Sequence, residues 1–194
     1  MMPQSDLFTA DPPEGLPSGF RYQPEFLTAL EEQTLCAWIA TLDLKPFEFR
    51  GYQGLRRVQA FGVRYDYGSR KVERAADFPL ALLSLRDRAA RWAGHKAEDI
   101  AMMLVSEYRP GAPIGWHRDR PQFEDVIGVS LLAPANFRLR RAQDGSADKS
   151  WERRSLTLAP RSIYLLSGEV RRHWEHSIPP LEALRYSITL RTLA

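Results

Sequence analysis

Two stretches of the chain repeat apolar residues with the spacing of a helix. The first contains Leu35, Trp38, Ile39 and Leu42, and the second contains Leu82, Leu85, Ala89, Trp92 and Ala93. Residues three and four apart share one face of a helix, so each stretch predicts an amphipathic helix that buries that face.

Most of the remaining apolar residues fall in short runs rich in β-forming side chains. These runs are residues 58–67, 100–108, 126–132, 136–141, 155–158, 162–166 and 185–193. Turn signals separate them, for example at residues 109–111 and 179–180. Short strands at regular spacing indicate a β-sandwich or jelly roll, and we expect the two helices to back one of its sheets. The predicted class is α+β and mainly β.

The length and composition fit one globular domain, because the chain is too short for two full catalytic domains. A length of 194 residues, of which 44% are hydrophobic and 26% charged, allows a substantial core. We expect a loosely ordered segment at 1–18 and one domain at 19–194. The first residues lack a basic stretch followed by an apolar one, and no apolar run is long enough to span a membrane. Cys36 is the single cysteine, which fits the reducing cytoplasm. We also predict that the protein is a monomer.

Candidate chemistry is concentrated in the stretch GWHRDR. On a strand, His117 and Asp119 would project from the same face about 6.5 Å apart, close enough to share one metal ion. A chance His-x-Asp on the surface is the competing interpretation. A metal would need a third ligand from a distant segment, for which His173 and His176 are the candidates. His176, which precedes a proline turn, is the better one.

Two histidines and one carboxylate form the facial triad of non-haem Fe(II) oxygenases, although zinc also accepts these ligands. The last predicted strand favours an oxygenase. Alternation puts Arg185, Ser187, Thr189 and Arg191 on one face and apolar residues on the other. The two arginines lie about 20 Å apart along the backbone, so side chains leaning inward would leave a gap for a small diacid. An ordinary solvated strand face is the alternative.

Together these segments resemble the AlkB family of Fe(II)- and 2-oxoglutarate-dependent dioxygenases. The resemblance rests on SEYRPGAPIGWHRD, FEDVIGVSLL, HSIPP and RYSITLR, in that order. It implies a double-stranded β-helix, a jelly-roll variant, with iron held by His117, Asp119 and His176. It further implies that Arg185 and Tyr108 hold the distal carboxylate of 2-oxoglutarate, and that Arg191 lies near the metal-bound end or braces Asp119.

Two positions depart from the family pattern. Ser106 stands where relatives usually carry an asparagine near the cosubstrate, and a hydroxyl there can still donate a hydrogen bond over a shorter reach. Pro121 occupies a position where several repair enzymes carry an acid that contacts the flipped base, so the base preference is left open.

The resemblance also implies a lid that receives a base. Residues 55–71 interleave arginines with aromatic side chains, as single-strand binding requires. Within this stretch we select Arg57 and Tyr65 as substrate contacts, and we add Trp116, which precedes the first ligand; packing on the core is the alternative for each. Trp174 is a weaker candidate for the pocket. A second basic cluster is formed by Arg138, Arg140, Arg141, Lys149, Arg153 and Arg154, on strands flanking a polar tip at 142–154.

The predicted function is therefore an Fe(II)- and 2-oxoglutarate-dependent dioxygenase that consumes dioxygen and demethylates alkylated bases in DNA or RNA, as in DNA repair. Hydroxylation of a modified tRNA nucleoside or of a protein side chain is the alternative within the family. A nucleic-acid-binding module without turnover and a zinc hydrolase are the alternatives outside it. The zinc hydrolase leaves the arginines of the last strand unexplained.

Overall fold

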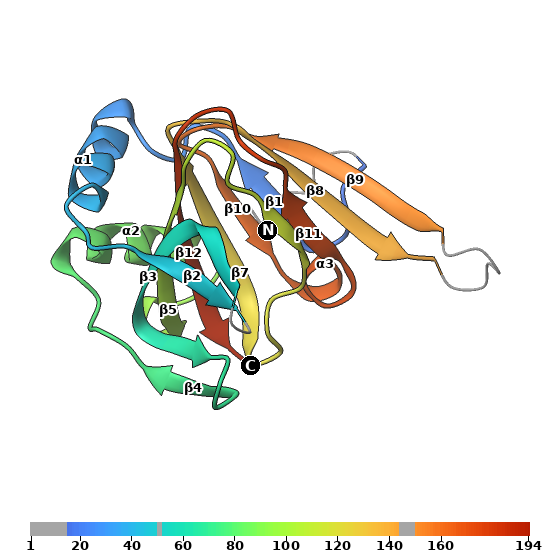
Figure 1. The fold of residues 1–194 in the computed structure, drawn as a ribbon, viewed down its shortest axis with the longest axis horizontal. Coiled ribbons are helices and arrows are strands. Elements are labelled where there is room, and N and C mark those ends of the chain that lie inside the picture. The colour runs from blue at the N-terminus through green and yellow to red at the C-terminus, as the bar shows by residue number, and fades with distance from the viewer. Residues whose placement is uncertain (1–14, 50–51, 144–149) are drawn as a thin grey trace, which may run out of the picture.

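The computed structural model describes residues 15–49, 52–143 and 150–194, and within them two antiparallel sheets face each other (Figure 1). The major sheet has the order β1-β10-β7-β12-β5-β3-β2, with β4 paired to β3. Its strands are β1 (Phe20–Gln23), β2 (Lys45–Phe49), β3 (Tyr52–Asp66), β4 (Lys71–Arg74), β5 (Ile100–Tyr108), β7 (Phe123–Leu131), β10 (Ile163–Leu166) and β12 (Arg185–Leu193).

The minor sheet has the order β6-β11-β8-β9. It consists of β6 (Ile114–His117), β8 (Ala135–Ala142), β9 (Trp151–Leu158) and β11 (Glu175–Ile178). Strands distant in the sequence alternate between the sheets, as in a jelly roll, so the predicted fold class is confirmed. No helix in the described part of the chain combines the length and the apolar character needed to cross a bilayer.

Both predicted helices exist and cover the outer face of the major sheet (Figure 1). They are α1 (Ala29–Ile39) and α2 (Leu80–Ala93); a short 3₁₀ helix, η1 (Ala97–Asp99), follows. Thr28 and Glu31 form a capping box that fixes the start of α1. Apolar residues of both helices, such as Ile39 and Leu82, pack in one core with Ile188 of β12. The apolar face of the last strand is therefore buried, as the alternation predicts.

A second core fills the space between the sheets at one end of the molecule. It contains Phe20, Phe137, Tyr164 and Trp174. Gly128 of β7 lets the ring of Tyr164 approach, because a Cβ atom built on Gly128 would lie 2.1 Å from the Tyr164 Cζ. Because Phe137 belongs to the minor sheet and Tyr164 to the major sheet, this core joins the two sheets.

The structure corrects several boundaries. The strand expected through GWHRDR ends at His117, and residues 118–122 form a loop. Arg171 of α3 (Gly168–His173) holds this loop, because its Nη2 donates to the carbonyls of Arg120 at 2.7 Å and Phe123 at 2.6 Å. The backbone carbonyls here therefore accept hydrogen bonds from a guanidinium group and not from a neighbouring strand. Asp119 is therefore positioned by a loop.

The polar tip predicted at 142–154 is shorter than expected. Ala142 belongs to β8 and Trp151 to β9, where the two residues pair directly. The centre of the predicted tip, with Lys149, lies outside the described residues, as do residues 1–14 of the segment expected to be loosely ordered. Short elements such as β1, β11 and α3 were not predicted, because four to six residues are too few to show a clear period.

Candidate active site

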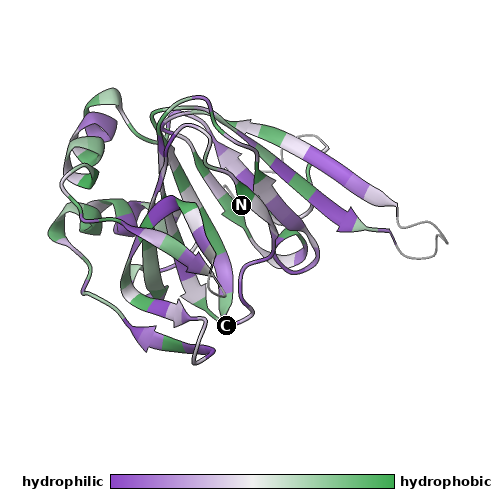
Figure 2. Cartoon of the chain, viewed as in Figure 1, coloured by the Kyte–Doolittle hydropathy of each residue, from purple (hydrophilic) through white to green (hydrophobic). Residues whose placement is uncertain are grey.

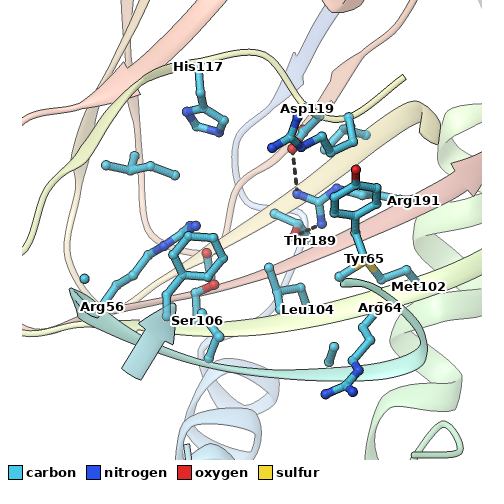
Figure 3. A pocket seen from close by; sticks show the side chains of 18 of the residues that line it. Arg56, Arg64, Tyr65, Met102, Leu104, Ser106, His117, Asp119, Thr189 and Arg191 are labelled. Carbon is cyan, nitrogen blue, oxygen red and sulfur yellow. Dashed lines mark hydrogen bonds and ion pairs between the residues drawn. The ribbon is translucent and has the colours of Figure 1, made fainter. Parts of the chain in front are cut away.

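A cavity of about 1330 Å³ opens between the two sheets. His117, Asp119 and Arg191 converge on one part of it, while Arg56, Ser106 and Tyr65 line other walls (Figure 3). The cavity is also lined by His176, Tyr108, Trp116 and Arg185. Segments from β3, β5, β6, β11 and β12 thus meet at one place.

His117 and His176 lie side by side because β6 and β11 pair with these two residues in register. Their ring centroids are 4.2 Å apart. The Nδ1 of His117 is 2.8 Å from the carbonyl oxygen of Gly115. A carbonyl only accepts hydrogen bonds, so this Nδ1 carries the proton and Nε2 presents its lone pair to the cavity.

Both imidazoles are neutral at physiological pH. Burial lowers the pKa of His117, and burial together with the neighbouring His117 lowers the pKa of His176 to about 3. A metal ion binds the neutral imidazole. The protonation states therefore suit ligands.

Asp119 faces the same space from the loop after β6. Arg191 donates from Nη2 to the Oδ1 of Asp119 at 3.1 Å, and the Oδ2 is buried without a hydrogen-bond partner among the described residues. Burial alone would raise the pKa of this carboxyl, but the charge of Arg191 beside it holds the pKa well below its usual range. A buried carboxylate oxygen without a partner costs free energy that a cation would recover.

Within the described ranges, no group of three or more histidine, cysteine, aspartate or glutamate side chains lies close enough together to hold a metal ion. The donor set nevertheless fits a divalent cation: two neutral imidazoles lie in contact, and a charged carboxylate has one oxygen unengaged.

Arg185 and Arg191 both point into the cavity from β12. Only 1% of Arg185 is exposed to solvent. Its Nε donates to the Oγ of Ser130 at 3.1 Å, whereas its Nη1 is buried without a partner among the described residues. Burying an unpaired guanidinium nitrogen is costly, so this atom marks a place where an anion would be stabilised. The solvated strand face considered as the alternative is excluded.

Tyr108 and Ser106 of β5 lie beside this guanidinium. Tyr108 pairs in register with Arg185, and Ser106 pairs with Ser187. The guanidinium carbon of Arg185 is 5.0 Å from the centre of the Tyr108 ring. Burial alone would raise the pKa of the Tyr108 phenol, but the guanidinium groups of Arg56 and Arg185 bring it below its ordinary value. The local field favours an anion.

The aromatic wall at the mouth includes Tyr65 and Trp116. Tyr65 packs edge-on against Tyr67, and the guanidinium of Arg120 lies 5.1 Å from the Tyr65 ring centre. The guanidinium of Arg140 lies 4.4 Å from the centre of the Trp116 ring. Both sequence-selected aromatics therefore border the cavity.

Arg57 requires a correction, because it does not line the cavity. Its Nε and Nη2 bind the Glu107 carboxylate at 2.8 and 2.9 Å on the other side of β3. Its neighbour Arg56 lines the cavity instead, with its guanidinium 4.0 Å from the centre of the Phe47 ring. Strand alternation separates the two faces, and no signal in the sequence shows which of the two arginines faces the cavity.

The other sequence candidates lie elsewhere. His173 is exposed at the end of α3, and Trp174 is 2% exposed within the core between the sheets. Of the two histidines considered as third ligand, only His176 lines the cavity.

Comparison with known proteins adds to this geometry. Residues 19–191 match the 2OG-Fe(II) oxygenase superfamily. The "Alkylated DNA repair protein ALKBH8 homolog" of Arabidopsis thaliana is 32% identical over a 178-residue alignment, and the match covers 80% of this chain and 49% of that protein. The "tRNA (carboxymethyluridine(34)-5-O)-methyltransferase ALKBH8" of Macaca fascicularis is 27% identical over 172 residues, or 86% of this chain and 25% of that protein.

The chain therefore spans about half the length of the plant relative and about a quarter of the macaque one. Among solved structures, OsALKBH1 has the same fold, with a TM-score of 0.65 over 91% of this chain and 98% of that chain, at 16% identity.

Proposed function

Because the chain belongs to the 2OG-Fe(II) oxygenase superfamily and is AlkB-like, we propose that it oxidatively demethylates alkylated bases in DNA or RNA, with residues 19–194 as the catalytic domain. The family implies Fe(II), 2-oxoglutarate and dioxygen as cofactor and cosubstrates. The observation that carries the proposal is the meeting of two neutral imidazoles, a charged carboxylate and two buried guanidinium groups in one aromatic-rimmed cavity.

In this proposal His117, Asp119 and His176 hold the iron. The Nε2 of His117 is the donor, because its Nδ1 bonds to Gly115. Arg191 keeps Asp119 ionised and fixes its Oδ1, leaving Oδ2 for the cation. When bound, the iron with 2-oxoglutarate and dioxygen supplies the oxidising chemistry.

Arg185 is the proposed partner of the distal carboxylate of 2-oxoglutarate. A carboxylate opposite its unpaired Nη1 would gain a charge-assisted hydrogen bond in a buried setting. The phenol of Tyr108 and the hydroxyl of Ser106 lie on the neighbouring strand and orient the same ligand. Both groups are almost wholly withdrawn from solvent, which strengthens the hydrogen bonds that they make.

The rim receives the base. Tyr65 and Trp116 offer faces for stacking, and Arg56 replaces Arg57 as the cationic contact from β3. Insertion of one oxygen atom into a C–H bond of an N-methyl group gives an N-hydroxymethyl group, which loses formaldehyde and restores the unmodified base. The task of the protein residues is to place that methyl group beside the iron and to exclude water.

A second candidate is hydroxylation of a modified tRNA nucleoside. Two observations favour it: the macaque relative carries tRNA in its name, and Pro121 is not an acid that could contact a cationic damaged base. Cationic Arg56 and Arg120 at the cavity suit a nucleic acid better than a protein side chain.

The test is anaerobic addition of Fe(II) and 2-oxoglutarate, followed by oxygen with methylated oligonucleotides or tRNA. We expect a weak visible charge-transfer band for the chelate, then succinate, formaldehyde and loss of the methyl group by mass spectrometry. A product that instead gains one oxygen atom would select the tRNA alternative. In His117→Ala the band should vanish, and a band of unchanged strength would refute the ligand assignment.

A further inference from the structure

The outer face of the minor sheet carries aromatic and cationic side chains, and of those named below Trp116 alone also lines the active-site cavity. Phe137 and Leu139 of β8 point into the core, so alternation turns Arg138 and Arg140 outward. Strand pairing places Arg153 of β9 opposite Arg140, and Trp151 opposite Ala142. Together with Trp116 of β6, we name this set the tryptophan–arginine face: Trp116, Arg138, Arg140, Trp151 and Arg153.

These side chains form a stacked series. The guanidinium of Arg140 lies 4.4 Å from the ring centre of Trp116 and 4.1 Å from that of Trp151, and that of Arg138 lies 5.0 Å from Trp116. The planar groups therefore alternate as indole, guanidinium and indole. Trp116 also lines the active-site cavity, so the series begins at its mouth.

The charge on this face is positive. Its three arginines are opposed by one acid on the same face, Glu175, which pairs with Arg140 at 2.7 Å. Within the described residues no carboxylate pairs with Arg138 or Arg153, and Arg153 is exposed. β8 and β9 extend as a hairpin beyond the rest of the minor sheet, with hydrophilic residues along much of it (Figures 1 and 2). A purely structural stack would not require these two additional cations.

We propose that the tryptophan–arginine face binds the single-stranded nucleic acid that flanks the target base. The ring centres of Trp116 and Trp151 are at most about 8.5 Å apart, because the guanidinium of Arg140 lies 4.4 Å from one and 4.1 Å from the other. A stacked strand advances about 3.4 Å per nucleotide, so this span holds about two to three nucleotides. Bases would stack on the indoles and phosphates would contact Arg138 and Arg153, the combination by which single strands are bound without sequence preference. This inference rests on the proposed function, since it extends the path of the same substrate.

The test measures binding and turnover separately. Binding of an unmodified single strand is followed by fluorescence anisotropy at several salt concentrations, for the wild-type protein and for Trp151→Ala, Trp151→Phe and Arg153→Gln. Arg91→Gln, on α2 at the far side of the major sheet, is the matched charge control. Turnover is compared for a long methylated strand and a methylated mononucleotide, which has no flanking nucleotides to contact the face.

We expect Trp151→Ala to weaken binding of the long strand by about tenfold and Trp151→Phe to restore most of it, because either aromatic ring can stack on a base. Arg153→Gln should reduce the slope of log affinity against log salt by about 0.7, the value for one lost phosphate contact on a single strand. Arg91→Gln should change neither. Turnover of the mononucleotide should be equal in all variants, and equal thermal melting shows that the variants fold.

Three results would overturn the inference: wild-type affinity in both Trp151→Ala and Arg153→Gln, a loss in Arg91→Gln as large as in Arg153→Gln, or tighter binding of a duplex than of the single strand. Failure of the proposed function looks different. In that case no substrate yields an oxidised product, while the binding pattern of the variants is unaffected.

Discussion

Replacing Arg185 by methionine separates the stability of the fold from the affinity for the cosubstrate. The Arg185 guanidinium is almost fully buried, donates through Nε to Ser130, and has an Nη1 with no partner among the described residues. In the absence of an anion, removing this donor recovers about 1–3 kcal/mol, while the loss of the hydrogen bond from the charged Nε to Ser130 costs about 1.5–3 kcal/mol. Arg185→Met should therefore melt within a few degrees of the wild-type protein, or above it.

The affinity for 2-oxoglutarate should change much more. Truncating one partner of a buried, hydrogen-bonded charge pair costs about 2–5 kcal/mol, which is roughly a 30-fold to 5000-fold rise in Kd. At a concentration of 100 times the wild-type Kd, the ligand adds about 2.7 kcal/mol to the stability of the wild-type protein. A chain of this size gains about 2–4 °C per kcal/mol, so its Tm should rise by about 5–11 °C.

The assay is a thermal melt with and without 2-oxoglutarate under anaerobic conditions with Fe(II), together with KM for 2-oxoglutarate from succinate formation. A hundredfold weaker Kd would leave Arg185→Met with about 0.4 kcal/mol of ligand stabilisation, or about 1–2 °C. The double variant Arg185→Met/Ser130→Ala is the control for the broken hydrogen bond. A full wild-type shift in Arg185→Met would refute the assignment of Arg185 to the cosubstrate carboxylate.

Two further predictions concern stability. Hydrogen bonds from Arg57 lower the pKa of Glu107 below its ordinary value, so this carboxylate stabilises the fold above the unfolded pKa near ~4.3, and the contribution is lost as the pH falls through the folded value. Urea unfolding from neutral to acidic pH should therefore show a shallower acid loss in Glu107→Gln than in the wild-type protein, and identical profiles would contradict this. Gly128→Ala should destabilise the fold by about 1–3 kcal/mol, because the new methyl group meets the Tyr164 ring; Gly115→Ala, where nothing lies within 4 Å, is the control, and equal urea midpoints for both would show the reasoning to be wrong.

The parts of the site that could be read from the sequence are those governed by strand alternation. The bounds of β12 agree with the predicted run 185–193, and its polar side chains line the cavity while Ile188 is in the core. A strand with one apolar face and one cationic face fits the sheet in one orientation, with the apolar face in the core and the cationic face toward the cavity. The preference for His176 over His173 rested instead on the proline turn after His176, and of the two only His176 lies on a strand of the minor sheet and lines the cavity.

Where the backbone leaves the sheet, alternation fails. Asp119 was expected on the strand of His117, yet a loop held by Arg171 carries it. No local pattern in GWHRDR predicts this contact, because the guanidinium belongs to Arg171, on a helix, 48 residues after Phe123 in the sequence. For Arg57, the alternation of side chains along the strand was predicted, but not which face of the strand points into the cavity. Without the strand partners of β3, nothing distinguished the face of Arg57 from that of Arg56.

Long-range pairing also explains why the tryptophan–arginine face was seen only as a basic cluster. Arg138, Arg140 and Arg153 are visible in the sequence as charges, but stacking depends on which aromatic residue the sheet brings beside each one. Trp116 of β6 lies beside Arg140 of β8 because β6 and β8 are the two neighbours of β11 in the minor sheet. The same pairing of β6 with β11 sets His117 against His176. A slip of one residue in that register would turn His176 out of the cavity and also disturb the stack, so the proposed iron site and the proposed site for the flanking strand depend on the same strand pairing.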